Sequence, residues 1–166
     1  IQMKQPILEM RNITKKFGRV VANEDVNLIL NAGEIHALLG ENGAGKSTLM
    51  NILTGIYKPN SGAIYYKGEK VKIKSPRHAV ELGIGMVHQH FMLVPSFTVA
   101  QNIVMSKEPR KFGIFYDLKE ANNITGRLVE EYGLEVEAED TVEEISVGLQ
   151  QRVEILKMLY RENEIL

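Results

Sequence analysis

The sequence contains no cysteine, and no charge of one sign prevails, since the formal net charge is −1. Without cysteine, disulfide bonds and thiol catalysis are excluded, and the composition agrees with a reducing compartment. A net charge this close to zero indicates neither a nucleic-acid partner nor an anionic-membrane patch. No apolar run approaches the roughly 20 residues that span a bilayer, so we expect no direct membrane insertion.

The remaining composition is typical of an ordinary globular protein. Hydrophobic residues make up 44% and charged residues 25% of the 166 positions. That length suffices for one sizeable core, or for one core with a small satellite subdomain. The sequence shows no internal repeats and no low-complexity tracts.

A glycine-rich segment at residues 40–48 carries the clearest motif in the chain. It fits the pattern G-x-x-x-x-G-K-[ST] of phosphate-binding loops and consists of Gly40, Glu41, Asn42, Gly43, Ala44, Gly45, Lys46 and Ser47, followed by Thr48. The apolar run 35–39 before it predicts a buried strand, and residues 48–54 after it predict a helix that ends at Gly55. Strand, loop and helix are the context that this motif requires.

The motif indicates a site for a nucleoside triphosphate with Mg²⁺. Glycines let backbone N–H groups approach phosphates closely, and a helix start adds unpaired N–H groups and a positive dipole end. We expect Lys46 to contact the β- and γ-phosphates and Ser47 to ligate Mg²⁺. Thr48 is expected to touch the α-phosphate.

The rest of the sequence predicts an α/β fold, with a P-loop NTPase core, an antiparallel β subdomain and an inserted α-helical subdomain. Alternating apolar and polar residues predict strands at 7–13 and 26–30 and a hairpin at 63–66 and 71–73. Residues 83–89 predict a second core strand. Loops are expected at 14–19 and 107–115. Helices are predicted to begin after good N-cap residues, which are Ser75, Thr98, Asp117 and Ser146.

These elements divide the chain into three expected parts. The antiparallel β layer and the P-loop core occupy residues 1–90. The α-helical subdomain occupies 91–160, and 161–166 leads into a further strand.

Three further patterns have more than one interpretation. Lysines alternate on one strand face, which suits a solvated edge better than a nucleic-acid contact; these are Lys70, Lys72 and Lys74. His88 and His90 stand at strand spacing, but no acidic or cysteine cluster accompanies them, so we do not expect a metal site there. The acidic stretch 135–144 suits a solvated connector or a surface for a basic partner.

Three features besides the phosphate-binding loop make the chain resemble the nucleotide-binding domain of ABC-type ATPases over most of its length. They are Phe17, Gln89 after the second core strand, and Ile145-Ser146-Val147-Gly148-Leu149-Gln150-Gln151-Arg152. The resemblance implies that Phe17 stacks on the adenine ring and that Gln89 senses the γ-phosphate and its Mg²⁺. Lys46 and Gln89 are therefore the catalytic residues expected in this chain.

The signature segment of that family is usually Leu-Ser-Gly-Gly-Gln, and residues 146–150 take its place here. The resemblance implies that this helix start reaches across a dimer to the γ-phosphate of the partner domain. The residues expected to do so are Ser146, Val147, Gly148, Leu149 and Gln150. Val147 and Leu149 depart from the usual pattern, and Leu149 stands where the family has a polar glutamine.

Residues 54–62 and 86–91 look most like those of ATPases that drive simple-sugar or nucleoside import. The resemblance implies an ATP-binding subunit of an ABC importer, which uses ATP and Mg²⁺ and couples ATPase activity to transmembrane transport. Its partners would be a second nucleotide-binding domain and transmembrane permease subunits. It would be peripheral, at the cytoplasmic side of the cell membrane. The alternative is a soluble ABC-type ATPase without a transport role, in which nucleotide only regulates assembly.

The sequence ends at Asn163-Glu164-Ile165-Leu166, before the Walker B strand that the resemblance implies. In the family, that strand ends in an aspartate that helps to hold Mg²⁺ and a glutamate that activates water. We therefore expect an N-terminal fragment that binds ATP with little or no hydrolysis. Because the missing strand would pair beside the phosphate-loop strand, we also expect an unpaired sheet edge.

Overall fold

The computed structural model describes residues 5–88 and 92–166, and the chain divides into two compact units between Leu82 and Gly83. The ranges expected from the sequence divide the chain differently, at residue 90. The structure groups 83–85 with the last residues because the Gly85 N–H donates to the Ile165 carbonyl at 2.8 Å and the Glu164 N–H donates to the Gly83 carbonyl at 2.8 Å.

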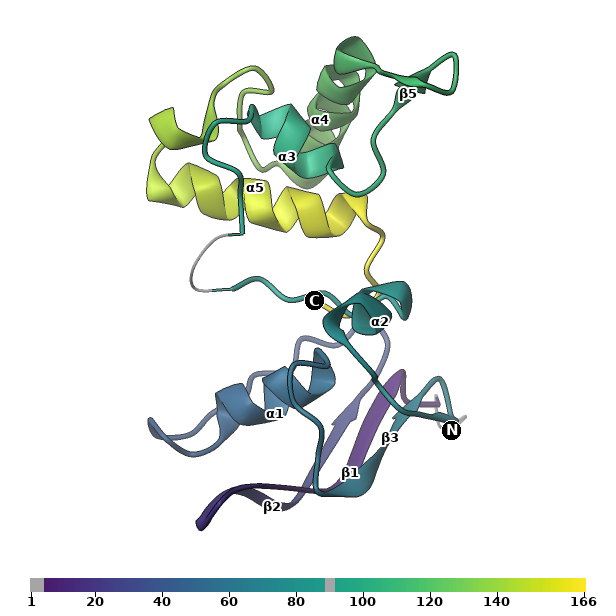
Figure 1. The fold of residues 1–166 in the computed structure, drawn as a ribbon, viewed down its shortest axis with the longest axis vertical. Helices are drawn as coiled ribbons and strands as arrows, with labels where there is room; N and C mark the ends of the chain where they lie inside the picture. The colour runs from purple at the N-terminus through teal and green to yellow at the C-terminus, as the bar shows by residue number, and fades with distance from the viewer. Residues whose placement is uncertain (1–4, 89–91) are drawn as a thin grey trace. The chain divides into compact units, whose positions relative to one another are not determined.

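The first unit contains a four-stranded antiparallel sheet, with the strand order β2-β1-β3-β4 (Figure 1). The strands are β1 Leu8–Phe17, β2 Val20–Leu30, β3 Ser61–Tyr66 and β4 Glu69–Val71. The predicted strands and the predicted hairpin are therefore confirmed. The loop expected at 14–19 is wrong for most of its length, because β1 continues to Phe17 by pairing with β2.

One bulge in β1 keeps its apolar side chains on the core face. Met10 pairs with Leu28 on one side and with Ile64 on the other, which forms a buried row across the sheet. The register then shifts around Asn12, whose φ is 52°. This extra residue moves the alternation by one position, so Ile13 is fully buried although strict alternation from Met10 would turn it outward.

Two helices complete the first unit, α1 Lys46–Leu53 and α2 Pro76–Glu81. Helix α1 buries Leu49, Ile52 and Leu53, and it lies beside the sheet (Figure 1). As predicted, α1 ends just before Gly55, which has a left-handed φ of 76°, and Ser75 caps α2 by accepting from the His78 N–H.

The two core strands predicted from apolar runs are not formed as such. Residues 35–39 belong to no strand, and Ile35 is fully exposed. In the second run only Ile84 forms an isolated parallel bridge, with Ile165, while 85–88 belong to no strand and Gln89 lies outside the described residues. An apolar run becomes a strand only when a neighbouring backbone satisfies its N–H and C=O groups. In the described part of the chain, 35–39 have no such neighbour.

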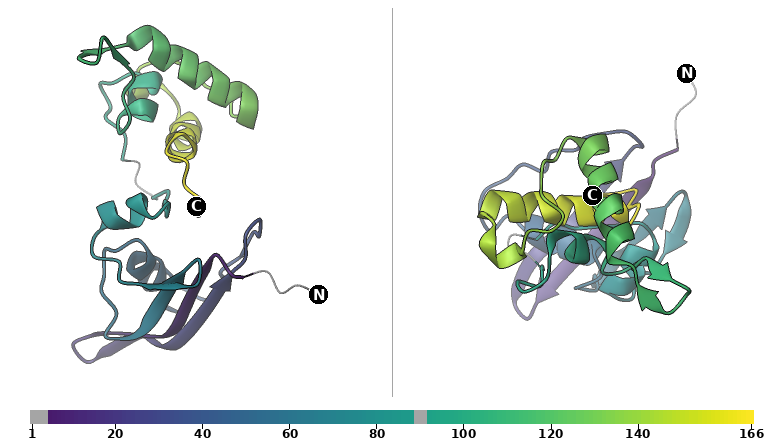
Figure 2. Two further views of the ribbon diagram at one scale, coloured as in Figure 1. Left: turned by 90° about the vertical axis from the view of Figure 1, so that its right-hand side faces the viewer. Right: turned by 90° about the horizontal axis from the view of Figure 1, so that it is seen from above.

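The second unit is mainly helical, with α3 Val99–Val104, α4 Leu118–Tyr132, the short 3₁₀ helix η1 Val142–Glu144 and α5 Val147–Tyr160 (Figures 1 and 2). The three N-caps predicted in this unit are confirmed. The Thr98 hydroxyl accepts from Gln101 N–H in a complete capping box, Asp117 accepts from Glu120 N–H, and Ser146 accepts from Leu149 N–H.

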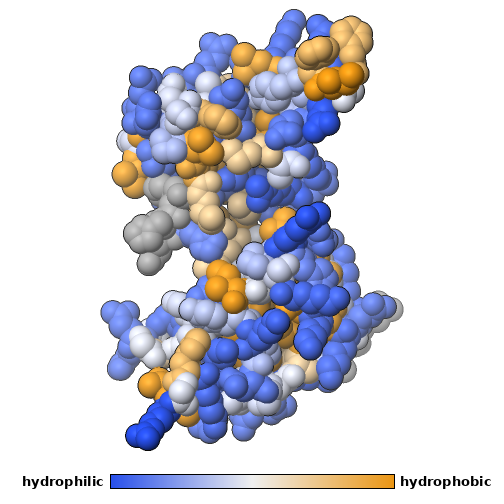
Figure 3. All heavy atoms as spheres, viewed as in Figure 1, coloured by the Kyte–Doolittle hydropathy of each residue, from blue (hydrophilic) through white to orange (hydrophobic). Residues whose placement is uncertain are grey.

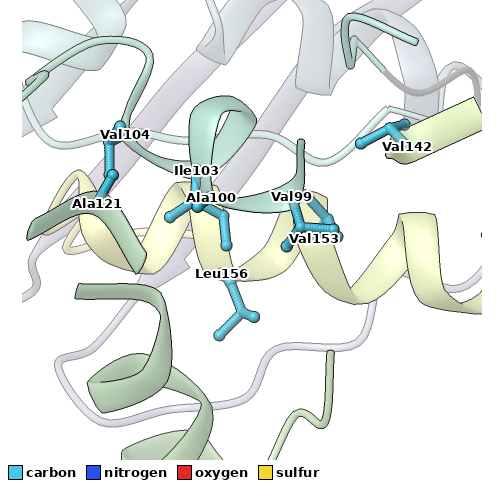
Figure 4. Close-up of a cluster of buried hydrophobic side chains, with 8 residues drawn as sticks. All are labelled: Val99, Ala100, Ile103, Val104, Ala121, Val142, Val153 and Leu156. Carbon is cyan, nitrogen blue, oxygen red and sulfur yellow. The ribbon is translucent and has the colours of Figure 1, made fainter. Parts of the chain in front are cut away.

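A cluster of buried apolar side chains joins these helices. Figure 4 shows α3 and α5 contributing most of it, with single residues from α4 and η1. The cluster consists of Val99, Ala100, Ile103, Val104, Ala121, Val142, Val153 and Leu156. Leu118 and Tyr132, at the two ends of α4, lie outside this cluster and are exposed.

The loop expected at 107–115 contains a short hairpin, formed by β5 Arg110–Lys111 and β6 Phe115–Tyr116. Its turn exposes Phe112 and Ile114, and Figure 3 shows apolar side chains at this end of the unit. None of the helices in the described ranges has the length and apolar character required to cross a bilayer.

We expect the substitution Gly55→Ala to lower the free energy of unfolding by about 2 to 4 kcal/mol. The new Cβ would sit 2.6 Å from the Ser75 carbonyl carbon and oxygen, and the left-handed backbone adds strain. The matched control is Gly126→Ala in α4, where a Cβ meets nothing within 4 Å and should stabilise the helix by about 0.5 to 1 kcal/mol. Urea denaturation followed by circular dichroism checks both values, and equal effects would contradict the packing argument.

Candidate nucleotide-binding site

The site predicted at 40–48 lies in the first unit, at the start of α1. Gly45 occupies the N-cap position with φ 84° and ψ 5°, and no side chain caps the helix. The first intrahelical bond runs from the Leu49 N–H to the Gly45 carbonyl at 2.9 Å. In the described part of the chain the backbone N–H groups of Lys46, Ser47 and Thr48 have no acceptor. Such a helix start attracts an anion, because its free N–H groups and dipole carry positive charge.

Strand β2 holds the glycine loop at one point. The Asn23 side chain is 6% exposed, and its Nδ2 donates to the Gly45 carbonyl at 3.2 Å. A Cβ on Gly45 would overlap the Ala22 carbonyl oxygen and would lie 2.6 Å from Asn23 Nδ2. Glycine is therefore required here both by its left-handed φ and by the closeness of β2. No motif in the sequence indicated the part that Ala22 and Asn23 play.

Lys46 folds back across the loop that precedes it. Its Nζ donates to the Gly40 carbonyl at 2.6 Å and to the Glu41 carbonyl at 2.7 Å. A Cβ on Gly40 would lie 3.7 Å from Lys46 Cδ and 3.4 Å from the Ala44 Cβ, which are ordinary contact distances, so the lysine side chain packs directly against this end of the loop. The ammonium group is thus placed over the loop, where it adds a full positive charge to the backbone donors.

The hydroxyl groups of Ser47 and Thr48 are also available. Ser47 is exposed and Thr48 is half-buried, and no hydrogen bond of the described residues uses either hydroxyl. The remaining loop residues, Glu41, Asn42, Gly43 and Ala44, are exposed. Oxygen ligands suit Mg²⁺, and ammonium and N–H donors suit phosphate oxygens, so the donor set fits MgATP.

Phe17 lies at the end of β1 and is 42% exposed. Its ring meets the Tyr57 ring edge-on, with the centroids 5.1 Å apart, and Lys15 Nζ lies 5.0 Å from its centroid. Phe17 pairs with Val20 of β2, two residues before the Ala22 carbonyl that borders Gly45. The backbone of Phe17 and the glycine loop therefore adjoin the same short part of β2. No motif in the sequence indicated that Tyr57 and Lys15 lie against Phe17.

The signature segment lies in the second unit, at the exposed start of α5. Val147 and Gly148 are exposed, and a Cβ on Gly148 would meet nothing within 4 Å. Leu149 is half-buried. Gln150 points back toward the preceding turn, because its Nε2 donates to the carbonyls of Val142 at 3.1 Å and Ile145 at 3.3 Å. The structure therefore leaves the first two helical residues open to a ligand and uses the Gln150 side chain internally.

One predicted site residue, Gln89, cannot be placed against the loop. Gln89 lies outside the described residues, as does His90. Among the residues that the structure does describe, no cluster of histidines and carboxylates forms a metal site.

Known proteins resemble this chain over most of its length. The family model described as "ABC transporter" matches residues 23–166. The chain is 58% identical over 160 residues to the guanosine import ATP-binding protein NupO of Bacillus subtilis, which covers 96% of this chain and 31% of that protein. It is 57% identical to the nucleoside import ATP-binding protein NupA of Lactococcus lactis, and 46% identical to a ribose import ATP-binding protein, RbsA, of Caldanaerobacter subterraneus. These two matches cover 98% of the chain and 32% and 33% of the relatives.

Solved structures show the same fold. A nucleotide-free ATP-binding cassette from an ABC transporter matches with a TM-score of 0.79 at 26% identity, over 95% of this chain and 66% of that one. The cbiO1 protein of Clostridium perfringens matches with a TM-score of 0.76 at 26% identity, over 95% and 62%. The expected α/β P-loop fold is confirmed. The chain spans about a third of the length of the curated relatives that it matches.

We expect Gly45→Ala to displace the start of α1, whereas Gly43→Ala should leave it in place. Both glycines have a φ near 85°, so both variants carry about 1 to 2 kcal/mol of backbone strain, but only Gly45 lacks space for a Cβ. Backbone amide NMR shifts of Asn23 and of residues 46–49 report the displacement. If the two variants perturbed these shifts equally, the contact with β2 would not be the reason for glycine at position 45.

Proposed function

The chain belongs to the ABC transporter family, and on this premise we propose that it is the nucleotide-binding part of an importer ATPase. The observation that carries the proposal is the open start of α1. There three unpaired backbone N–H groups, the Lys46 ammonium and two free hydroxyls surround one glycine loop. This donor set suits the triphosphate and the metal of MgATP.

Within this site each residue has a proposed role. Lys46 and the N–H groups at the start of α1 neutralise the β- and γ-phosphates, and Ser47 supplies an oxygen ligand to Mg²⁺ when the metal is bound. Phe17 stacks on the adenine ring, which its exposed face allows. We propose Gln89 as the γ-phosphate and Mg²⁺ sensor on the resemblance to the family. Hydrolysis would also need the family's aspartate and glutamate, which are not among the 166 residues. We therefore propose that this sequence alone binds MgATP with little or no turnover.

The signature segment is proposed to act on a second nucleotide-binding domain. Ser146 and the open N–H groups of Val147 and Gly148 would meet the γ-phosphate held by that domain. Gln150 would contribute indirectly, since its side chain holds the turn before α5. Leu149, half-buried, would pack rather than touch the nucleotide.

The transported solute is proposed from the relatives. Their names specify guanosine, nucleoside and ribose import, and these solutes share a pentose. We propose a nucleoside or simple-sugar importer, whose permease subunits bind this ATPase at the cytoplasmic side of the membrane. Uptake of labelled guanosine and of labelled ribose by cells that carry the full-length protein with its permease would distinguish the two solutes.

We expect Lys46→Ala to weaken MgATP binding about 10- to 100-fold, because a hydrogen bond to a charged group contributes about 1.5 to 3 kcal/mol. Isothermal calorimetry measures the dissociation constant. Lys119→Ala is the control, since Lys119 is an exposed lysine on α4. Unchanged affinity in Lys46→Ala would refute the assignment of the phosphate site.

We expect Phe17→Ala to weaken ATP binding about 5- to 100-fold while leaving the affinity for inorganic tripolyphosphate unchanged. The ring contributes base stacking of about 1 to 3 kcal/mol, and a ligand without a base cannot use it. Phe112→Ala, at an exposed phenylalanine of the β5–β6 turn, is the control. A parallel loss for both ligands would mean that Phe17 supports the loop instead of binding the base.

A further inference from the structure

Helix α5 contains a buried lysine that takes no part in the site described above. Lys157 is 4% exposed, and its Nζ donates to the Met92 carbonyl at 2.7 Å. Glu154, almost one turn earlier, is 2% exposed, and its Oε1 lies 3.8 Å from Lys157 Nζ. Within the described residues this carboxylate oxygen has no hydrogen-bond partner. The pair is therefore a buried ammonium with one strong acceptor, the backbone carbonyl of Met92.

A buried ion pair of this kind adds little to the free energy of unfolding. Burial lowers the pKa of Lys157, and the nearby Glu154 only partly opposes that effect by raising it. Replacing a buried ion pair with apolar side chains of similar volume is often neutral or stabilising. The charged pair instead fixes a position, because the Lys157 ammonium holds the Met92 carbonyl at one place along α5.

A second buried polar residue holds the same segment from α3. Asn102 is fully buried, and its Oδ1 accepts from the Val94 N–H at 2.8 Å. Its Nδ2 donates to the carbonyls of Val94 and Thr98, both at 3.1 Å. The segment 92–98 is thus bound to α5 at its start and to α3 over the rest of its length. Apolar contacts alone would allow this segment to shift along the helices. Hydrogen bonds to particular backbone groups fix its position.

The two ends of this connection are the parts of the second unit that are proposed to respond to nucleotide. Met92 follows Gln89 by three positions, and α5 begins at the signature residue Ser146 and contains Lys157. We propose that Lys157 is a positioning residue of the ATPase. Its bond to the Met92 carbonyl makes the segment 92–98 and the signature helix move as one body. This inference rests on the proposed function, because it assigns a role in ATP turnover.

The test compares two variants of the full-length protein, Glu154→Gln and the double variant Glu154→Gln with Lys157→Met. The first removes the buried carboxylate charge but retains the bond to Met92. The second removes the bond without leaving an unpaired charge. Lys107→Met is the matched control, since Lys107 is an exposed lysine of the same unit that pairs with Glu162 at 3.1 Å. Each protein is measured for thermal midpoint, amide hydrogen exchange of residues 92–98, and kcat and KM for ATP.

We expect the double variant, relative to Glu154→Gln, to exchange amides in 92–98 about tenfold faster, which is the effect of one lost charge-assisted hydrogen bond. We also expect kcat to fall about tenfold, with KM for ATP and the thermal midpoint unchanged. Unchanged exchange or unchanged kcat would overturn the proposal. A thermal midpoint that falls with kcat would also overturn it, because the bond would then be a stability element only. The exchange measurement requires no ATP, so it stands apart from the proposed function, whose failure shows as a Lys46→Ala protein with unchanged ATP affinity.

Discussion

The candidate site depends on one close contact, in which strand β2 approaches the backbone at Gly45. The Ala22 carbonyl leaves no space for a Cβ, and Asn23 donates to the Gly45 carbonyl. This contact holds Gly45 in the left-handed conformation that begins α1. With no side-chain cap at this position, the first N–H groups of the helix stay unpaired and face the loop. The donors of the site are therefore mostly backbone groups, and the sheet determines where they point.

The two helix starts that we propose to contact nucleotide differ in how they are capped. At α5 the Ser146 hydroxyl satisfies the Leu149 N–H, and Gln150 ties the helix to the turn before it. At α1 no side chain does this, so its first turn has more unpaired donors. The difference suits the proposed roles. In that proposal the start of α1 and Lys46 hold the phosphates of one nucleotide, whereas α5 has a rigid start that would meet a phosphate held elsewhere.

Most of the regular elements could be predicted from the sequence, because their signals are local. The N-caps Ser75, Thr98, Asp117 and Ser146 begin helices where expected, and alternation located the antiparallel strands. The failures share a cause. The run 35–39 is apolar enough for a buried strand, but strand formation depends on a neighbouring chain, and the described residues supply none. Likewise β1 extends to Phe17 because β2 pairs with it, which no local pattern indicated.

The same distinction applies to the site. The sequence by itself determined the phosphate-binding loop, Lys46 and Ser47, because the glycine spacing and the following helix are encoded within nine consecutive residues. Only the tertiary structure showed that Asn23 and Ala22 hold Gly45, that Tyr57 meets Phe17, and that Lys157 binds the Met92 carbonyl. These contacts join residues that are far apart in the chain. A local motif indicates which chemical groups a segment offers, whereas the packing of the folded chain determines which of these groups come into contact.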